Sequence, residues 1–359
     1  MKKIIRLSIY LIVVVCIMII GGKIVLPKNN PSILNPTQHQ EYEAFYKLPE
    51  NTIDVVFLGA SHMYFSVSPE DLYHDYGFTS IDLYGAEQKI WQSYYYLEDC
   101  YQNQKPKVVV LEMVWAISDE PQSIAYNHQQ IDAMRWSSIK IDAIRTAVKN
   151  NPEEHFMDYV FPIFPYHDRW NQINRQDITY FFTEAKTPAK GFFTWFGHGT
   201  GQFPISAYEQ GEKSYQLPEV TIQYLEKIQE LCQKNDTKLV FVTAPTCEYW
   251  DGAKASAVQQ YANQHDIIYW DFNANDALRE EVNIDWELES PDGGNHLDYY
   301  GAMKYTRCLG SHLTENFELP DKRKDTTYKK WEEDYDSYKQ LIEGYLKDNP
   351  KYRRDDVVW

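Results

Sequence analysis

Cysteine is scarce in this chain, and the few cysteines present follow no metal-binding pattern. There are five among 359 residues, and the four beyond Cys16 include no C-x-x-C pair. This spacing argues against a zinc site and against a disulfide scaffold, although a single disulfide bond remains compatible with it. A Gly-rich phosphate loop and clustered metal ligands are also missing. We therefore expect no cofactor and no metal ion, and phosphoryl or metal chemistry is not expected.

Basic residues are scarce once the N-terminus is set aside. Residues 1–30 hold five Lys or Arg and no acid, which leaves 30 basic and 52 acidic residues in the remainder, a net charge of −22. That much negative charge argues against a nucleic-acid partner and against a face that rests on anionic lipid.

The N-terminus carries a long apolar run. Lys2, Lys3 and Arg6 precede the uncharged residues 7–22. A hydrocarbon core about 30 Å thick needs roughly 20 such residues, so the run can just span it if Lys23 reaches outward to the interface. No small-residue cleavage pattern follows, which favours an uncleaved anchor over a cleaved signal or a buried helix.

This anchor predicts the location of the rest of the chain. Positive charge stays on the cytoplasmic side, so residues beyond about 28 are expected outside the cytoplasm. We expect residues 1–27 to form a cytoplasmic start and single-pass anchor in the cell membrane. Residues 28–50 are rich in proline and are expected to form an extended stalk.

Apolar strand-like runs alternate with amphipathic helical segments after the stalk. This alternation is typical of a parallel sheet that is covered on both faces. The predicted fold class is α/β, a three-layer α/β/α arrangement of flavodoxin-like type around a central parallel five-stranded sheet. The five expected strands are 53–58, 81–84, 107–113, 239–244 and 267–272.

Two further segments complete the expected organisation. The α/β domain covers 51–317, and residues 116–216 are too many for a simple crossover, so they are expected to form an inserted helical subdomain or lid. Residues 318–359 are highly charged but contain an apolar stripe at helical spacing, which predicts a docked helix with a ragged end. The stripe consists of Trp331, Tyr335, Tyr338, Ile342 and Tyr345.

The candidate chemistry begins at Ser61, in a Gly-x-Ser turn directly after the first strand. Such a turn presents a hydroxyl above the sheet, although a serine there also suits the cap of the following helix. Far downstream, Asp292-Gly-Gly-Asn-His296 places an acid and an imidazole in one short loop before a helix. If the two segments meet, Ser61 is the nucleophile, His296 the base and Asp292 the group that orients the base.

Other polar residues are weaker candidates. His62 is a poor base because it adjoins the serine, and it is expected to line the pocket. His167 and Arg169 form a cluster in the insertion, where Arg169 could hold a phosphate or carboxylate of a polymer or belong to a structural salt bridge. His198 is a further pocket candidate, and Cys247 is a less favoured alternative nucleophile. The many tyrosines and tryptophans fit either a carbohydrate-facing surface or an aromatic core.

Several segments together resemble the SGNH (GDSL-type) hydrolases. Within that superfamily the chain is similar to the membrane-anchored extracellular branch related to the lipoteichoic-acid D-alanyl transfer protein, which the insertion segment 166–170 also resembles. The likeness covers roughly residues 50–315. The matching segments are Gly59-Ala-Ser-His62, Asp82-Leu-Tyr-Gly85-Ala, Pro106-Lys-Val-Val-Val-Leu-Glu112 and His296-Leu-Asp-Tyr-Tyr-Gly-Ala.

This resemblance implies roles for particular residues. The N–H groups of Ser61 and Gly85 would form the oxyanion hole. The family's aspartate usually stands three residues before the histidine, where this chain has Gly293, so Asp292, Glu289 and Asp298 are all candidates for orienting the base.

The superfamily's Gly-x-Asn-Asp block, a source of a further oxyanion donor, is replaced here by Glu112-Met-Val-Trp115. Glu112 is therefore a pocket candidate. The resemblance implies a serine esterase or O-acyltransferase that acts on ester-linked acyl groups of a cell-envelope polysaccharide or teichoic-acid-like polymer. It also implies a membrane-bound O-acyltransferase as a partner. The alternative is a non-catalytic scaffold or binding protein for such an acyltransferase.

Overall fold

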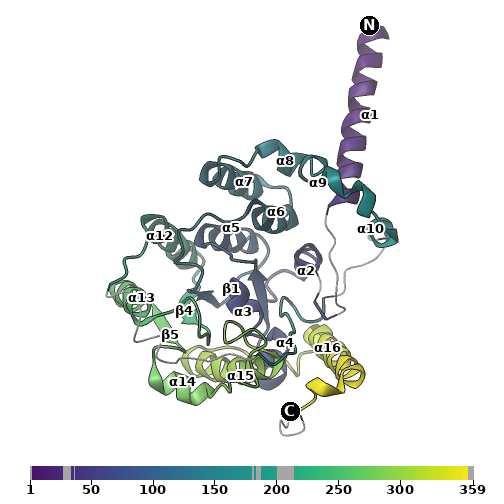
Figure 1. Cartoon of the computed structure of the whole chain (residues 1–359). Coiled ribbons are helices and arrows are strands. Elements are labelled where there is room, and N and C mark those ends of the chain that lie inside the picture. The colour runs from purple at the N-terminus through teal and green to yellow at the C-terminus, as the bar shows by residue number, and fades with distance from the viewer. Residues whose placement is uncertain are drawn as a thin grey trace.

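The computed structural model describes residues 2–26, 34–35, 37–179, 182, 187–199 and 214–354. Its centre is a five-stranded sheet in which all paired strands are parallel, in the order β2-β1-β3-β4-β5 (Figure 1). This is the flavodoxin-like order, with the chain reversing direction across the sheet between β1 and β3. The strands are β1 Val55–Gly59, β2 Ser80–Tyr84, β3 Val108–Glu112, β4 Lys238–Thr243 and β5 Ile268–Asp271.

Helices cover both faces of the sheet, which confirms the predicted three-layer α/β class. One face carries α5 Ile90–Cys100, α12 Glu219–Lys234 and α13 Gly252–Gln264. The other carries α4 Pro69–Tyr76, α14 Asp276–Val282, α15 Tyr299–Asn316 and α16 Lys329–Asp348.

Alternate strand residues supply the two cores. Val56 and Leu58 of β1 pack with the first group of helices, whereas Val55 and Phe57 pack with the second. Strands buried on both faces need continuous apolar sequence, which is why β1 and β3 were visible as unbroken runs.

The helices of the insertion lie between residues 124 and 179 in its described part. Its first half packs beside α5, and its last described part, residues 187–199, returns to the carboxyl ends of β1 and β2. The residues between 182 and 187 and between 199 and 214 lie outside the described part. The elements are α6 Ile124–Ala133, α7 Ser138–Asn150, α8 Phe156–Val160, α9 Ile163–Tyr166, the 3₁₀ helix η1 His167–Gln172 and α10 Arg175–Thr179.

The predicted stalk is wrong for residues 37–50. They begin with helix α2, Gln38–Phe45, whose residues Tyr42 and Phe45 are buried against the domain. Thr37 starts the helix with a capping box in which its side chain accepts from the Gln40 N–H and the Gln40 side chain accepts from the Thr37 N–H. This cap stabilises the start of α2 although the surrounding prolines favour an extended chain. Residues 28–33 and 36 of the predicted stalk lie outside the described residues.

The two ends of the chain form helices of opposite character. Helix α1, Lys2–Val25, is the one described helix long and apolar enough to cross a membrane, and its apolar side chains from Ile4 to Ile20 are mostly exposed. Helix α16 is the docked helix predicted near the C-terminus, and it buries Trp331, Tyr338 and Ile342 of the apolar stripe. The short 3₁₀ helices η3 Thr326–Tyr328 and η4 Pro350–Tyr352 flank it.

Candidate active site

Ser61 lies at the carboxyl end of β1, where the strand turns into the short helix α3, Ser61–Tyr64. A Cβ atom at Gly59 would lie 2.6 Å from the Cβ of Glu112 and 3.0 Å from that of Met63. Only glycine therefore lets the end of β1 approach β3 this closely before the chain turns. Ser61 opens α3, and the first N–H groups of a helix have no partner within the helix. Its N–H is thus free of the helix's own hydrogen bonds.

The loop that carries His296 is held in place from several sides. Gly293 and Gly294 adopt positive φ angles of 82° and 96°, a conformation that side chains disfavour. The Gly294 N–H donates to Ser290 Oγ at 2.8 Å, and the Thr246 hydroxyl donates to the Asn295 carbonyl at 3.0 Å. The loop after β4, which contains Thr246, thus stabilises the loop before α15.

The two distant segments meet above the sheet. Ser61 Oγ lies 2.7 Å from His296 Nε2, and His296 Nδ1 lies 2.6 Å from Asp292 Oδ2. The three side chains form a continuous hydrogen-bonded series with a hydroxyl at one end and a carboxylate at the other. This geometry allows the imidazole to accept the hydroxyl proton while the carboxylate fixes its tautomer.

Asp292 is the carboxylate that contacts the histidine. Its second oxygen, Oδ1, accepts the backbone N–H of His296 at 2.9 Å. Burial pushes the pKa of Asp292 upward, but the hydrogen bonds from the His296 ring and backbone outweigh it, so the pKa is lowered. Asp292 therefore stays ionised beside the ring.

The other two carboxylates are used elsewhere. Glu289 is buried and forms ion pairs with Lys304 at 2.8 Å and Arg354 at 2.9 Å. Asp298 caps α15 by accepting the N–H groups of Tyr300 and Gly301. Three carboxylates were candidates for orienting His296. In the described part of the chain, the Asp292 side chain is the one of the three that bonds to His296.

His62 lies beneath the histidine rather than in an open pocket. Its ring is buried and stacks on the His296 ring, with centroids 5.0 Å apart and an interplanar angle of 30°. Its Nε2 lies 3.1 Å from Asn295 Oδ1. Burial, and then the nearby His296, lower the pKa of His62 to about 3, so this second imidazole stays neutral.

Glu112 and Gly85 surround the turn but differ from the expected arrangement. Glu112 is fully buried, its Oε1 accepts the Val114 N–H at 2.9 Å, and burial raises its pKa to about 8. It is therefore a neutral acid within the core and not part of an open pocket. The Gly85 N–H, expected in the oxyanion hole, makes a long 3.4 Å bond to the Gly59 carbonyl. Releasing this weak bond would free it for an oxyanion.

Aromatic side chains form one side of the site. The Phe65 ring lies 5.1 Å from that of His296 and 5.2 Å from that of Trp195, and Trp195 is 37% exposed. Trp195 comes from the returning segment of the insertion, which is tied to the turn by a 2.7 Å bond from the Phe193 N–H to the Tyr64 carbonyl. The sequence signal that could have found these residues is the cluster of four aromatic residues within 191–199.

The other insertion candidates make contacts elsewhere. Arg169 donates to the Val25 carbonyl at the end of α1 and lies 3.6 Å from Asp177. His167 is exposed, and its Nδ1 lies 2.7 Å from the Phe164 carbonyl. These contacts place the 167–169 cluster at the foot of α1, so its assignment to the substrate pocket is wrong. Sequence could not reveal this, because the position depends on how α9 and η1 pack against α1.

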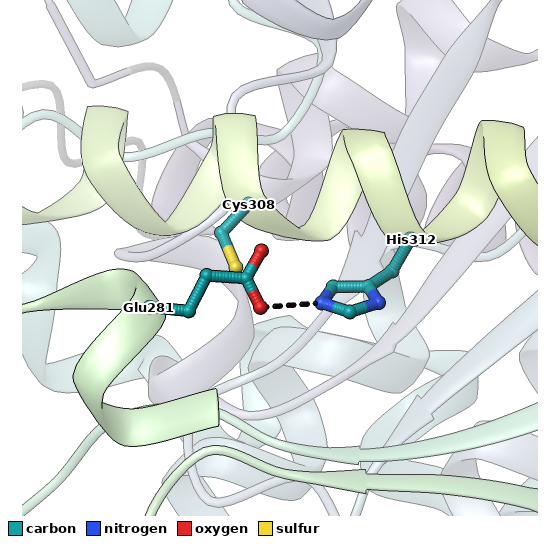
Figure 2. A group of neighbouring side chains, drawn as sticks. All are labelled: Glu281, Cys308 and His312. Carbon is teal, nitrogen blue, oxygen red and sulfur yellow. Dashed lines mark hydrogen bonds and ion pairs between the residues drawn. The ribbon is translucent and has the colours of Figure 1, made fainter. Parts of the chain in front are cut away.

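None of the five cysteines forms a disulfide. Cys247 is buried, and burial raises its pKa to about 12, so it stays protonated and is a poor nucleophile. Cys308 belongs to the one group of potential metal ligands found among the described residues, with Glu281 and His312 (Figure 2).

That trio lies between α14 and α15. Cys308 and His312 are one helical turn apart, and Glu281 Oε2 already bonds His312 Nε2 at 3.0 Å. Its ligand types are ones that zinc accepts. It shares no residue with Ser61, His296 or Asp292.

Comparisons with known proteins assign this chain to no family. The sequence matches no protein-family model and no curated protein. Among solved structures it is similar to a proposed acylhydrolase from Bacteroides fragilis NCTC 9343, with 13% identity and a TM-score of 0.38. The alignment covers 80% of this chain and 99% of the other. A likeness this distant carries no information on residue roles or substrate.

Proposed function

We propose that this chain is a membrane-anchored, extracytoplasmic serine esterase or O-acyltransferase of the SGNH type, acting on ester-linked acyl groups of a cell-envelope polymer. The observation that carries the proposal is the series Ser61 Oγ, His296 Nε2, His296 Nδ1 and Asp292 Oδ2, with separations of 2.7 and 2.6 Å. A structural serine cap does not require a histidine and a carboxylate aligned behind it.

The reaction proceeds in two steps. Ser61 Oγ attacks the acyl carbonyl while His296 takes its proton, and the new oxyanion is held by the N–H groups of Ser61 and Gly85. His296 then gives the proton to the departing alkoxide, which leaves an acyl ester on Ser61. Water or a polymer hydroxyl attacks this ester, and His296 again removes and returns the proton. Water gives an esterase, and a polymer hydroxyl gives a transferase.

The surroundings of the site support a sugar-bearing substrate. Trp195 is partly exposed beside His296, and an exposed aromatic ring is a suitable surface for the apolar face of a sugar. The net charge of −22 in residues 31–359 argues against nucleic acid.

The anchor supports a place at the outer face of the membrane. Helix α1 has 24 residues, which at 1.5 Å per residue gives about 36 Å, enough to cross a hydrocarbon core about 30 Å thick. Residues that follow it would lie where membrane enzymes deliver acyl groups, which favours transfer over hydrolysis.

A fluorophosphonate probe tests the nucleophile. It forms a stable bond with a serine that an adjacent base activates, so the full-length protein should be labelled at Ser61, and Ser61→Ala should not be labelled. Ser66→Ala is a matched control that should keep the label, because Ser66 is a buried serine outside the hydrogen-bonded series.

A second candidate function is a non-catalytic partner of a membrane-bound O-acyltransferase. It is favoured by Glu112, which stands where the superfamily has an oxyanion-donor block, and by the Gly85 N–H, which is engaged by the Gly59 carbonyl. If well-folded protein takes up no probe and turns over no ester, but co-purifies with a membrane acyltransferase, the scaffold function replaces the enzyme.

A further inference from the structure

Exposed apolar side chains concentrate in one part of the insertion. Outside α1, the described residues include twelve large hydrophobic side chains that are exposed, and seven of them fall between residues 136 and 182. Trp170 is 71% exposed and Phe182 is 86% exposed. Soluble surfaces seldom gather so many apolar residues without a partner. We call these seven the apolar patch: Trp136, Met157, Phe164, Trp170, Ile173, Ile178 and Phe182.

Three of the elements that carry the patch lie at the outer end of α1. Helices α9, η1 and α10 all contact α1, and Figure 1 shows α9 and α10 at its foot. Gly21 and Gly22 allow this approach, because a Cβ at either position would lie 3.2 Å from the side chain of Ile163 or Pro162. Arg169 closes the contact by donating to the Val25 carbonyl. The patch is therefore fixed at the level where α1 would leave a bilayer.

A cavity next to this contact is shared by α1 and the insertion. It has a volume of about 910 Å³, and its walls include Val15 and Ile19 from the apolar part of α1 and Trp136 from the patch. Three cations, Lys23, Arg135 and Lys140, also line it and outnumber its two carboxylates, Glu43 and Asp132. Apolar walls together with cations suit a phospholipid, which carries an acyl chain and a phosphate.

Charge separates this segment from the rest of the domain. Residues 136–182 hold five basic and six acidic residues, a net charge of −1, whereas residues 31–359 together carry −22. A nearly neutral segment is repelled little by a membrane surface. The strongly acidic remainder of the domain would be repelled by anionic lipid. Tryptophan and phenylalanine are the side chains that favour the interface.

We propose that the apolar patch inserts into the headgroup and upper acyl region of the outer leaflet, and that the cavity beside α1 holds a lipid of that leaflet. This rests on the membrane location proposed above. The domain would then be held to the bilayer at two places, through α1 and through the insertion. These two attachments would hold Ser61 at one height and orientation above the membrane.

Quenching of tryptophan fluorescence by brominated lipid tests this contact. Full-length protein would be placed in nanodiscs of phosphatidylcholine, either plain or brominated near the upper end of the acyl chains. We expect brominated lipid to quench part of the emission, and the double variant Trp136→Phe/Trp170→Phe to lose most of that quenching. Thermal melts check that the variants fold, which is expected because both side chains are exposed.

Trp286→Phe is the matched control. Trp286 follows α14, which lies across the molecule from α1 in Figure 1, so this variant should keep the full quenching. Equal quenching in the wild type and the double variant would overturn the proposal. The absence of any quenching would also overturn it, because it would mean that a protein surface and not lipid covers the patch. Failure of the chain to enter nanodiscs would also overturn it. Fluorophosphonate labelling of Ser61 in the same samples reports separately on the proposed function.

Discussion

At the residue scale, the choice of carboxylate depends on two glycines. Sequence spacing left Asp292, Glu289 and Asp298 open. The left-handed conformations of Gly293 and Gly294 curl the loop back, so that a carboxylate four residues before the histidine reaches both its ring and its backbone N–H. The family's usual spacing of three residues does not predict this contact. The conformation of the loop, and not the number of residues in it, sets the distance between the carboxylate and the histidine.

Replacing this carboxylate should nearly abolish turnover. Asp292→Asn removes the charge that stabilises the imidazolium, and its amide can hold the ring in the wrong tautomer, so we expect a fall in kcat of about 10⁴-fold. His296→Ala should have an effect of similar size. Steady-state hydrolysis of a small aryl ester measures both.

Asp298→Asn is the matched control, because asparagine keeps the oxygen that caps α15. It should leave kcat within about twofold of wild type. A mild effect of Asp292→Asn together with a severe effect of Asp298→Asn would show that the wrong carboxylate has been assigned.

The buried acid beneath the turn predicts a dependence of stability on pH. Burial raises the pKa of Glu112 from 4.5 to about 8, so the folded chain binds a proton that the unfolded chain has released between these values. Stability therefore falls as pH rises from about 4.5 to 8, by up to about 1.4 kcal/mol per pH unit for one such group. Glu112→Gln should flatten this slope and raise stability near pH 8. Urea unfolding at several pH values checks it, and an unchanged slope would contradict the buried-acid account.

At the scale of elements, the five strands were predictable and α2 was not. Strands buried on both faces must be apolar throughout, and that pattern stands out in a single sequence. Helix α2 has eight residues within a proline-rich stretch, and its burial depends on contacts with α6. The capping pair Thr37 and Gln40 was the local signal that could have found it.

The end of β1 should tolerate no side chain at Gly59. Gly59→Ala would bring a methyl group to 2.6 Å from the Cβ of Glu112, so β1, β3 or the turn must move. We expect a loss of about 1–3 kcal/mol in the free energy of unfolding, with lower activity because Ser61 is displaced.

Gly344→Ala provides the comparison for this substitution. A Cβ there meets nothing within 4 Å, and the residue lies within α16. Alanine should therefore stabilise the helix by about 0.5–1 kcal/mol. Chemical denaturation of both variants measures the difference in the free energy of unfolding. If Gly59→Ala is as stable as Gly344→Ala, the close approach of β1 and β3 is refuted.

At the scale of the whole molecule, the insertion could be recognised but not placed. Its length showed that it was more than a crossover. Its position is set by long-range contacts such as Lys190, which is buried and pairs with Glu70 of α4 at 2.6 Å and Asp334 of α16 at 2.7 Å. Lys190 thereby joins the returning insertion to two helices distant in sequence, a pairing that local pattern cannot predict.

Removing this link should destabilise the whole molecule. Lys190→Met leaves two carboxylates without their buried cation, and we expect a loss of about 3–5 kcal/mol in the free energy of unfolding. Lys329→Met is the control. Among the described residues, the one ion pair of Lys329 is the exposed pair with Glu333 at 3.5 Å, which should contribute about 0.5 kcal/mol or less. Equal losses in the two variants would mean that Lys190 does not hold the segments together.

The central claim is that two segments 235 residues apart in sequence meet to activate Ser61. The most direct measurement is a rapid-mixing experiment with a chromogenic acyl ester, followed by mass spectrometry of the quenched protein. The account predicts a burst of leaving group close to one per chain and an acyl group on the peptide that contains Ser61, both lost in His296→Ala. A folded protein that shows no burst, or that carries the acyl group on another residue, would contradict it.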